Sequence, residues 1–418
     1  MFANEEILAL DEQYVIHTYG RYGVEFVKGS GVVLTDAAGH EYLDFLAGIG
    51  CTCLGHAHPA LVAALTDQVS KLWQISNYYH EENRGEFARL LSELLSTTTD
   101  ESGHIIGSTS DGWKTFFSNS GAEANEGAFK LARRWGEKHL DGASGIVTAR
   151  KSFHGRTLAT LAATGQDVFH KSFGPLPVGF DSVELNDIDA LIEALDHPSD
   201  KTGPVCAVML ECIQGEGGVW PAELEYLRAV RQACNERGIL LMVDEVQTGV
   251  FRTGAPVAFQ RASIVPDVVT VAKGVAGGFP TGGVAARTEV ADLLVPGDHG
   301  STFGGNPLAV AAGRACLQTL LDEEVGEHVI TTGEYLAKQL SALPHVLEVR
   351  GAGLMRGVQF DVPVANELVE QGLKRADGKR HGFVLNHIGD SILRFLPPLI
   401  VEREHVDELC DALQDMLQ

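Results

Sequence analysis

The sequence predicts an α/β protein whose main sheet is parallel and covered by helices on both faces. Two observations support this prediction: apolar runs of about five residues recur along the chain, and amphipathic helix patterns alternate with them. Strands that are buried on both faces of a parallel sheet have this composition. At roughly 100–200 residues per domain, the 418 residues suffice for one large domain and a smaller α+β domain.

The first elements are a hairpin and a long helix. A β-hairpin is expected over Gly31–Phe45, because apolar residues flank the turn Asp36–Gly39. From about residue 60, helices alternate with strands. The apolar pair Phe116–Phe117 precedes a helix whose buried face has the spacing i, i+3, i+4, i+7. This face consists of Ala128, Leu131, Ala132 and Trp135.

Three buried strands follow, over Val205–Ile213, Ile239–Val243 and Val268–Ala272. Between the first two, a helix is expected that ends at Gly238, since glycine commonly terminates helices. After Pro307 the pattern is again helical. The same apolar patterns then predict two short strands and a closing helix, which indicate the smaller α+β domain. The strands are expected around Val346–Arg350 and Leu354–Phe360, and the helix from Arg403.

Composition excludes several classes of function. The formal net charge of −24 repels phosphate backbones and anionic lipid, so nucleic-acid or membrane binding is not expected. The acidic start MFANEEILALDE does not resemble a signal peptide. Seven scattered cysteines indicate a reducing compartment. We therefore expect a cytoplasmic protein without a metal site.

Polar residues follow the predicted strands at the edge where open α/β sheets bind ligands. Ser118–Glu123 opens a helix and presents backbone N–H groups, although Ser120 and Glu123 are also an ordinary capping pair. Asp244 and Lys273 each follow a buried strand directly. A capping carboxylate and a solvated lysine are the simpler explanations of each residue alone. Together, the three features are the contacts that pyridoxal 5′-phosphate requires.

The chain resembles the class-III aminotransferases of pyridoxal-phosphate-dependent fold type I, and among them the acetylornithine-type enzymes. The resemblance covers nearly the whole chain. It implies a mainly parallel seven-stranded sheet in a large domain over residues 61–308, an N-terminal segment over 1–60 that packs with the small domain, and a small domain over 309–418. The motifs are Asp44–Pro59, Ser118–Glu126, Phe153–Thr157, Gln214–Gly218, Asp244–Gly249, Ala272–Gly274, Thr302–Pro307 and Leu393–Pro398.

The resemblance implies a role for each cofactor-binding residue. Lys273 would be the Schiff-base lysine and would move the proton of the substrate carbon. Asp244 would pair with the pyridinium nitrogen, Gln247 would bind the phenolic oxygen, and Phe153 would stack on the ring. The phosphate would be held by Ser120, Gly121 and Ala122, and by Thr302 of the neighbouring subunit. Composite sites of this kind imply a two-fold homodimer.

The same resemblance implies the substrate contacts. Arg156 would bind the carboxylate distant from the reacting amine, and Arg394 would bind the α-carboxylate of glutamate or 2-oxoglutarate. Glu216 would be a gate that neutralises Arg394 while the ω-amine is bound. Ser301 and Ile49 belong to the same predicted site, and the apolar Ile49 suits an acylated α-nitrogen better than the free amine of ornithine.

The resemblance thus implies transamination of N2-acetyl-L-ornithine with 2-oxoglutarate, in arginine biosynthesis. The products would be N-acetyl-L-glutamate 5-semialdehyde and L-glutamate. Other ω-amines remain open as substrates: 4-aminobutyrate, ornithine, succinylornithine and N-succinyl-diaminopimelate. A more distant alternative is a non-catalytic, doubly wound binding protein, although the dinucleotide motif G-x-G-x-x-G is not found after the first strand.

Overall fold

The largest element of the fold is a seven-stranded sheet with the order β6-β14-β13-β12-β9-β7-β8. The structure is a computed structural model, and it describes residues 5–418. Strand β14 is antiparallel to both of its neighbours, and all other adjacent strands are parallel. The mainly parallel, seven-stranded sheet is therefore confirmed. Its strands are β6 (Trp113–Ser118), β7 (Gly145–Ala149), β8 (Phe180–Val183), β9 (Val205–Leu210), β12 (Leu240–Asp244), β13 (Val268–Val271) and β14 (Gly282–Arg287).

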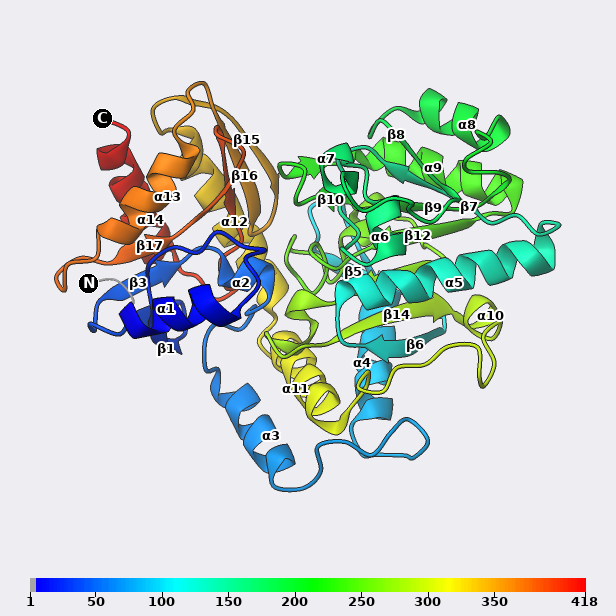
Figure 1. The fold of residues 1–418 in the computed structure, drawn as a ribbon, viewed down its shortest axis with the longest axis horizontal. Helices are drawn as coiled ribbons and strands as arrows, with labels where there is room; N and C mark the ends of the chain where they lie inside the picture. The colour runs from blue at the N-terminus through cyan, green and yellow to red at the C-terminus, as the bar shows by residue number, and fades with distance from the viewer. Residues whose placement is uncertain (1–4) are drawn as a thin grey trace.

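The central strands are apolar because helices cover both of their faces. Every residue of β7, β9, β12 and β13 is buried. Leu240 and Met242 of β12 pack in the cluster under α5, whereas Leu241 and Val243 pack in the larger cluster on the opposite face. Figure 1 shows α5 running across the sheet. Helices around the sheet are α4 (Arg84–Ser96), α5 (Gly121–His139), α6 (Leu158–Ala163), α7 (Asp167–His170), α8 (Ile188–Asp196), α9 (Leu224–Arg237) and α10 (Thr288–Ala291).

Most of the predicted elements are present, with shifted ends. Helix α9 ends at Gly238, which adopts the left-handed conformation with φ 64°. The strand predicted over Val205–Ile213 is wrong at its C-terminal end, because β9 leaves the sheet after Leu210. The chain then forms a small separate hairpin of β10 (Ile213–Gln214) and β11 (Trp220–Pro221). Two short 3₁₀ helices, η1 (Ala258–Ala262) and η2 (Lys273–Ala276), follow β12 and β13.

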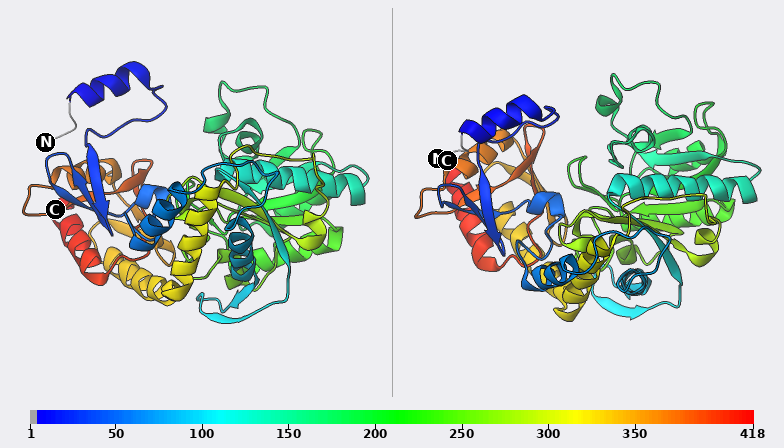
Figure 2. Two further views of the ribbon diagram at one scale, coloured as in Figure 1. Left: turned by 90° about the horizontal axis from the view of Figure 1, so that it is seen from below. Right: turned by 60° about the horizontal axis from the view of Figure 1, so that its bottom comes forward.

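A second lobe combines the N-terminal and C-terminal parts of the chain, as Figures 1 and 2 show. The predicted hairpin is confirmed as β2 paired with β3, with Val33 opposite Leu43. Strand β3 also pairs in parallel with β17, close to the end of the chain. Two four-stranded sheets result, β1-β2-β3-β17 and β15-β16-β19-β18. Their strands are β1 (Phe26–Ser30), β2 (Val33–Asp36), β3 (Glu41–Asp44), β15 (Val346–Ala352), β16 (Met355–Phe360), β17 (Gly382–Val384), β18 (Asn386–Ile388) and β19 (Ile392–Phe395).

Helix α11 joins the two lobes and packs against α3 and α4. The division into domains at residues 60 and 308 stays a prediction, and the first four residues of its N-terminal segment lie outside the described residues. Among residues 5–418, no helix is long and apolar enough to cross a membrane. The remaining elements are α1 (Glu5–Tyr14), α2 (Ala47–Gly50), α3 (Pro59–Val69), β4 (Thr97–Thr99), β5 (Ile105–Ser108), α11 (Pro307–Asp322), α12 (Val325–Ser341), α13 (Ala365–Lys374) and α14 (Arg403–Met416).

Candidate active site

A cavity of about 470 Å³ lies where β12 and β13 end and α5 begins. This is the edge of the sheet at which the sequence places its candidate residues. The predicted residues that line the cavity are Ser120, Gly121, Ala122, Phe153, Arg156, Glu216, Asp244, Gln247 and Lys273.

Three hydrogen bonds hold the side chain of Asp244 at the cavity. Asp244 is the last residue of β12 and is 4% exposed. Its Oδ2 accepts hydrogen bonds of 2.8 Å from Asn125 Nδ2 and 2.8 Å from His154 Nδ1, and its Oδ1 accepts one of 3.0 Å from the N–H of Val246. A carboxylate has about four acceptor positions. One position on Oδ1 is therefore free for a donor in the cavity.

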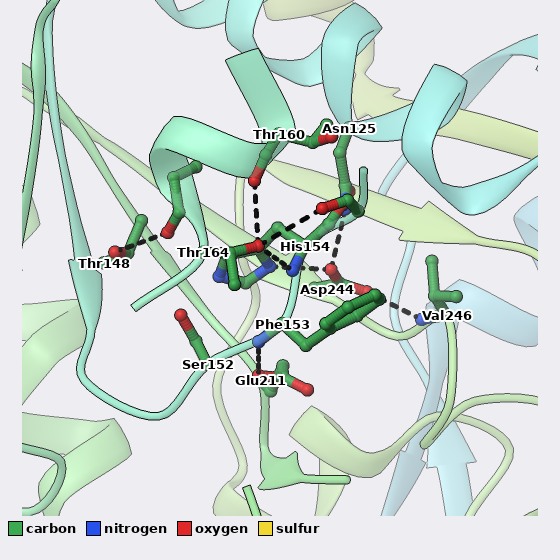
Figure 3. Close-up of polar contacts among 12 residues, drawn as sticks. Asn125, Thr148, Ser152, Phe153, His154, Thr160, Thr164, Glu211, Asp244 and Val246 are labelled. Atoms are coloured by element: carbon green, nitrogen blue, oxygen red, sulfur yellow. Dashed lines mark hydrogen bonds and ion pairs between the residues drawn. The ribbon is translucent and has the colours of Figure 1, made fainter. Parts of the chain in front are cut away.

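His154 and Asn125 line the cavity, and sequence reasoning missed both of them. Figure 3 shows both side chains directed at Asp244. The His154 side chain is fully buried, and burial alone would lower its pKa. The hydrogen bond and charge of Asp244, with a further contribution from Glu211, instead raise the pKa of His154 above its ordinary value. The raised pKa favours the protonated imidazole, whose positive charge lies against Asp244.

Lys273 follows β13 and has a strained backbone. Its φ of 47° lies in the left-handed region, which a residue with a Cβ rarely adopts. Such outliers persist where the surrounding structure enforces them, commonly at functional sites. The next residue, Gly274, is held through its carbonyl, which accepts hydrogen bonds from the thiols of Cys53 at 3.1 Å and Cys316 at 3.4 Å.

The first turn of α5 borders the cavity with unbonded backbone donors. The Ser120 hydroxyl accepts the N–H of Glu123 at 3.2 Å, and the Glu123 carboxylate accepts the N–H of Asn119 at 2.5 Å. The capping pair is therefore present, and it leaves the N–H groups of Gly121 and Ala122 without intrahelical acceptors. A Cβ on Gly121 would lie 2.8 Å from the Val246 side chain, so only glycine permits this close approach.

Phe153 is held over the cavity through its backbone. Its N–H donates to Glu211 Oε2 at 3.0 Å, and Figure 3 shows its ring beside Asp244. Burial raises the pKa of Glu211 to about 7, against the opposing influence of His154. Glu211 also lines the cavity, although sequence reasoning noted it only as part of a motif.

Glu216, which lines the cavity and is partly exposed, forms an ion pair with the buried Arg394. Arg394 Nη1 lies 2.5 Å from Glu216 Oε1, and Arg394 Nε donates to Asn386 Oδ1 at 2.9 Å. Burial alone would raise the pKa of Glu216, but Arg394, Lys273 and Gln247 hold it below its ordinary value. The carboxylate is therefore ionised at neutral pH.

Gln247 faces Glu216, and it has an unsatisfied atom. Its Nε2 donates to Glu216 Oε1 at 3.5 Å, whereas its Oε1 is buried without a partner among residues 5–418. A Cβ on Gly215 would lie 2.0 Å from this Oε1. Gly215 therefore has a packing role beside Gln247.

Four predicted residues do not line the cavity: Ile49, Ser301, Thr302 and Arg394, of which Arg394 is paired with the lining residue Glu216. Ile49 is 36% exposed and has a φ of 62°, two residues before Cys51, which does line it. Ser301 accepts from Asn119 Nδ2 at 3.3 Å. Thr302 is exposed on the surface, where its carbonyl accepts from Gln74. Among residues 5–418, no group of three or more His, Cys, Asp or Glu side chains could hold a metal ion.

Comparisons with known proteins identify the family. The family described as aminotransferase class-III matches residues 15–417. The acetylornithine aminotransferase of Caldanaerobacter subterraneus subsp. tengcongensis is 45% identical, over 98% of this chain and 99% of that protein. The chain belongs to the class-III aminotransferases.

Solved structures of similar enzymes share the whole fold. An ornithine aminotransferase from Toxoplasma gondii, described with partial occupancy of pyridoxal phosphate at its active site, superposes with a TM-score of 0.88 at 30% identity and covers 100% of this chain and 95% of its own. An acetylornithine aminotransferase from Elizabethkingia anophelis superposes with a TM-score of 0.81 at 30% sequence identity. The match covers 99% of this chain and 98% of that one. Fold type I and pyridoxal 5′-phosphate as the cofactor follow from this family membership.

The residues of the cavity fit this cofactor. Asp244 has a free acceptor position for a protonated ring nitrogen. The N–H groups at the start of α5 suit a phosphate. Gln247 has an unpartnered amide atom, and Lys273 supplies the amine within the same cavity.

Proposed function

We propose that this class-III aminotransferase transfers the δ-amino group of N2-acetyl-L-ornithine to 2-oxoglutarate. The products are N-acetyl-L-glutamate 5-semialdehyde and L-glutamate, and the step belongs to arginine biosynthesis. Curated relatives that are 41–45% identical over nearly the full chain, and are acetylornithine aminotransferases, support this substrate.

Two side chains that line the cavity, Lys273 and Asp244, would hold the cofactor. When bound, pyridoxal phosphate withdraws electrons from the substrate carbon and carries the amino group between the two half-reactions. Lys273 would bond to its aldehyde carbon and, once displaced by substrate, move the proton at the substrate carbon. Asp244, held by His154 and Asn125, would keep the ring nitrogen protonated.

The two arginines would bind the substrate carboxylates. Arg156 would hold the carboxylate distant from the reacting nitrogen in both substrates. Arg394 would hold the α-carboxylate of glutamate, after Glu216 moves away from it. The single observation that carries this assignment is the 2.5 Å ion pair of Arg394 with Glu216 at the wall of the cavity. A closed pair suits an ω-amine substrate, which has no carboxylate at that position.

A substrate panel tests the function. The recombinant protein is loaded with pyridoxal phosphate, and turnover of N2-acetyl-L-ornithine, N2-succinyl-L-ornithine, N-succinyl-diaminopimelate, ornithine and 4-aminobutyrate is compared with 2-oxoglutarate as acceptor. We expect the highest kcat/KM for acetylornithine. A higher kcat/KM for ornithine or 4-aminobutyrate would contradict the proposed substrate. Visible absorbance on adding the cofactor, lost in Lys273→Ala, distinguishes the enzyme from a non-catalytic binding protein.

A homodimer with shared active sites is part of the proposal. Exposed aromatic side chains surround Thr302: Trp73 is 59%, Tyr78 93% and Phe303 62% exposed. Asn77 Nδ2 donates to the carbonyls of Ser301 and Gly304, which joins these two segments into one surface. An exposed apolar surface of this kind indicates a protein interface. A second copy seated there would bring Thr302 to the neighbouring cavity, as the resemblance to the family implies.

The cytoplasmic location also stays a prediction. Its support is that the seven cysteines are all free in the structure, as is usual in a reducing compartment.

A further inference from the structure

Phe169 contacts two residues of the proposed site, although neither sequence reasoning nor the outline of the cavity selects it. Its ring lies under the guanidinium of Arg156, whose Cζ is 3.8 Å from the ring centroid. The same ring meets Phe153 edge to face, with the centroids 6.1 Å apart and the planes at 87°. Arg156 Cζ is also 5.4 Å from the Phe153 centroid. Phe169 therefore connects the arginine to the residue proposed to stack on the cofactor.

The short helix α7 holds Phe169 in this place. His170 Nε2 bonds to the carbonyl of Thr164 at 2.8 Å. Gln166 Nε2 donates to the carbonyls of Ser152 and Lys151, at 3.1 and 3.3 Å. These bonds attach α7 to the loop that carries Phe153 and Arg156, so the half-buried Phe169 ring has a defined position.

Arg156 depends on this contact for its orientation. Within residues 5–418 its guanidinium has no hydrogen bond or ion pair, even though the chain carries 56 acidic residues. Cation–π contacts with Phe169 and Phe153 are its only described interactions. A guanidinium stacked on an aromatic ring keeps its N–H donors at its edge free for a carboxylate.

We propose that Phe169 is a positioning residue that presents the Arg156 guanidinium to the substrate carboxylate distant from the reacting nitrogen. This inference rests on the carboxylate-binding role of Arg156 in the proposed function. Because a long arginine side chain loses rotamer freedom when it binds, prior stacking lowers the entropy cost of binding the carboxylate. The aromatic face, rather than apolar bulk alone, is the property that the site requires.

Three variants distinguish the effect of the aromatic face of Phe169 from the effect of its apolar volume and from a disturbance of the local fold. Phe169→Leu keeps apolar volume without a π face, and Phe169→Tyr keeps the face. Phe173→Leu is the matched control, because Phe173 lies four residues on, is 56% exposed and has no ring contact among residues 5–418. We expect Phe169→Leu to raise KM for acetylornithine and for 2-oxoglutarate roughly 3- to 30-fold. Its kcat should change less, and the other two variants should resemble wild type.

Two further measurements distinguish positioning from a general structural effect. Butylamine carries no carboxylate, so its half-reaction, followed by the absorbance of the cofactor, should be equally fast in wild type and Phe169→Leu. Glutarate has two carboxylates and no reactive nitrogen, and calorimetric titration should show a weaker Kd for Phe169→Leu by the same factor as KM.

Several results would overturn the inference: an unchanged glutarate Kd in Phe169→Leu, an equal slowing of butylamine, or a Phe169→Tyr variant as weak as the leucine variant. The glutarate titration does not depend on which amine the enzyme prefers. A failure of the acetylornithine assignment therefore shows only in the substrate panel, and a failure of the Phe169 role shows only here.

Discussion

At the scale of single residues, the ion pair of the buried Arg394 with the partly exposed Glu216 connects charge compensation to the choice of substrate. Arg394 is 2% exposed, and Glu216 is the carboxylate that neutralises it. Removing Glu216 would leave the charge of the buried Arg394 uncompensated, and because Glu216 is 29% exposed the cost is below the roughly 3–5 kcal/mol of a fully buried pair. A substrate carboxylate that replaces Glu216 recovers that cost, whereas an ω-amine substrate cannot.

We expect Glu216→Gln to slow the half-reaction with acetylornithine more than the half-reaction with glutamate, because only glutamate brings its own carboxylate to Arg394. Single-turnover kinetics of each half-reaction measure this difference. Glu348→Gln is the matched control, since Glu348 pairs at 2.9 Å with the buried Arg350. Equal effects of Glu216→Gln on both half-reactions would remove the gating role.

Glu245 predicts a pH dependence of stability. Burial raises the pKa of Glu245 to about 7, above its ordinary 4.5, despite hydrogen bonds from Thr248 and the N–H of Phe259. Between these values the folded chain binds more protons than the unfolded chain, so the free energy of unfolding falls as pH rises from about 4.5 to 7.

Glu245→Gln should remove this contribution, because the amide does not ionise and its oxygen still accepts from Phe259. Thermal midpoints of both proteins at pH 5, 6, 7 and 8, as trial conditions spanning that window, would then diverge in favour of the variant as pH rises. Parallel curves would show that Glu245 does not titrate in the folded chain.

At the scale of elements, sequence patterns predict those helices and strands whose positions depend on interactions between residues close in the chain. Strands β12 and β13 are predicted by their apolar runs, and the end of α9 is predicted by Gly238. The ends of these elements in the structure agree with the prediction within a residue or two. The strand predicted to reach Ile213 ends early, because apolar composition does not reveal where a strand leaves its sheet.

In the site, Asp244 and Lys273 could be predicted because each directly follows a buried strand. His154 and Asn125 could not be selected, since their partner Asp244 is about a hundred residues away. The only signal in the sequence is that His154 directly follows the predicted Phe153. Phe169 reaches Arg156 through a turn whose geometry no local pattern specifies.

Two helical glycines give opposite predictions. Gly136 in α5 has no room, since a Cβ would lie 1.9 Å from the carbonyl oxygen of Ala143. Gly136→Ala should therefore destabilise the fold by about 1–3 kcal/mol. Gly85 in α4 has nothing within 4 Å of its Cβ position, so Gly85→Ala should stabilise by about 0.4–1 kcal/mol. Denaturant unfolding measures both changes, and equal signs would contradict this packing of α5.

At the scale of the whole molecule, the proposed dimer explains why Thr302 lies on the surface rather than in its own cavity. Thr302 and Lys273 of one chain would then serve different sites. This arrangement makes a prediction that a monomeric enzyme could not meet.

Coexpression of Lys273→Ala with Thr302→Ala should restore activity above that of either variant alone. In each mixed dimer, one site receives an intact lysine from one chain and an intact threonine from the other. Lys273→Ala coexpressed with Asp244→Asn is the control and should not recover, because both residues belong to the same cavity. Activity that merely averages the two variants would contradict shared sites.

The parallel pairing of β3 with β17 places Leu43 opposite Phe383. During synthesis at about 5–20 residues per second, the early strand therefore waits roughly 17–70 s for its neighbour to leave the ribosome. Throughout that interval the edge of β3 is open to other nascent chains. The lobe that contains β3 and β17 can therefore close only after residues 382–384 have left the ribosome, so chaperone demand should be highest for chains that stall shortly before residue 382.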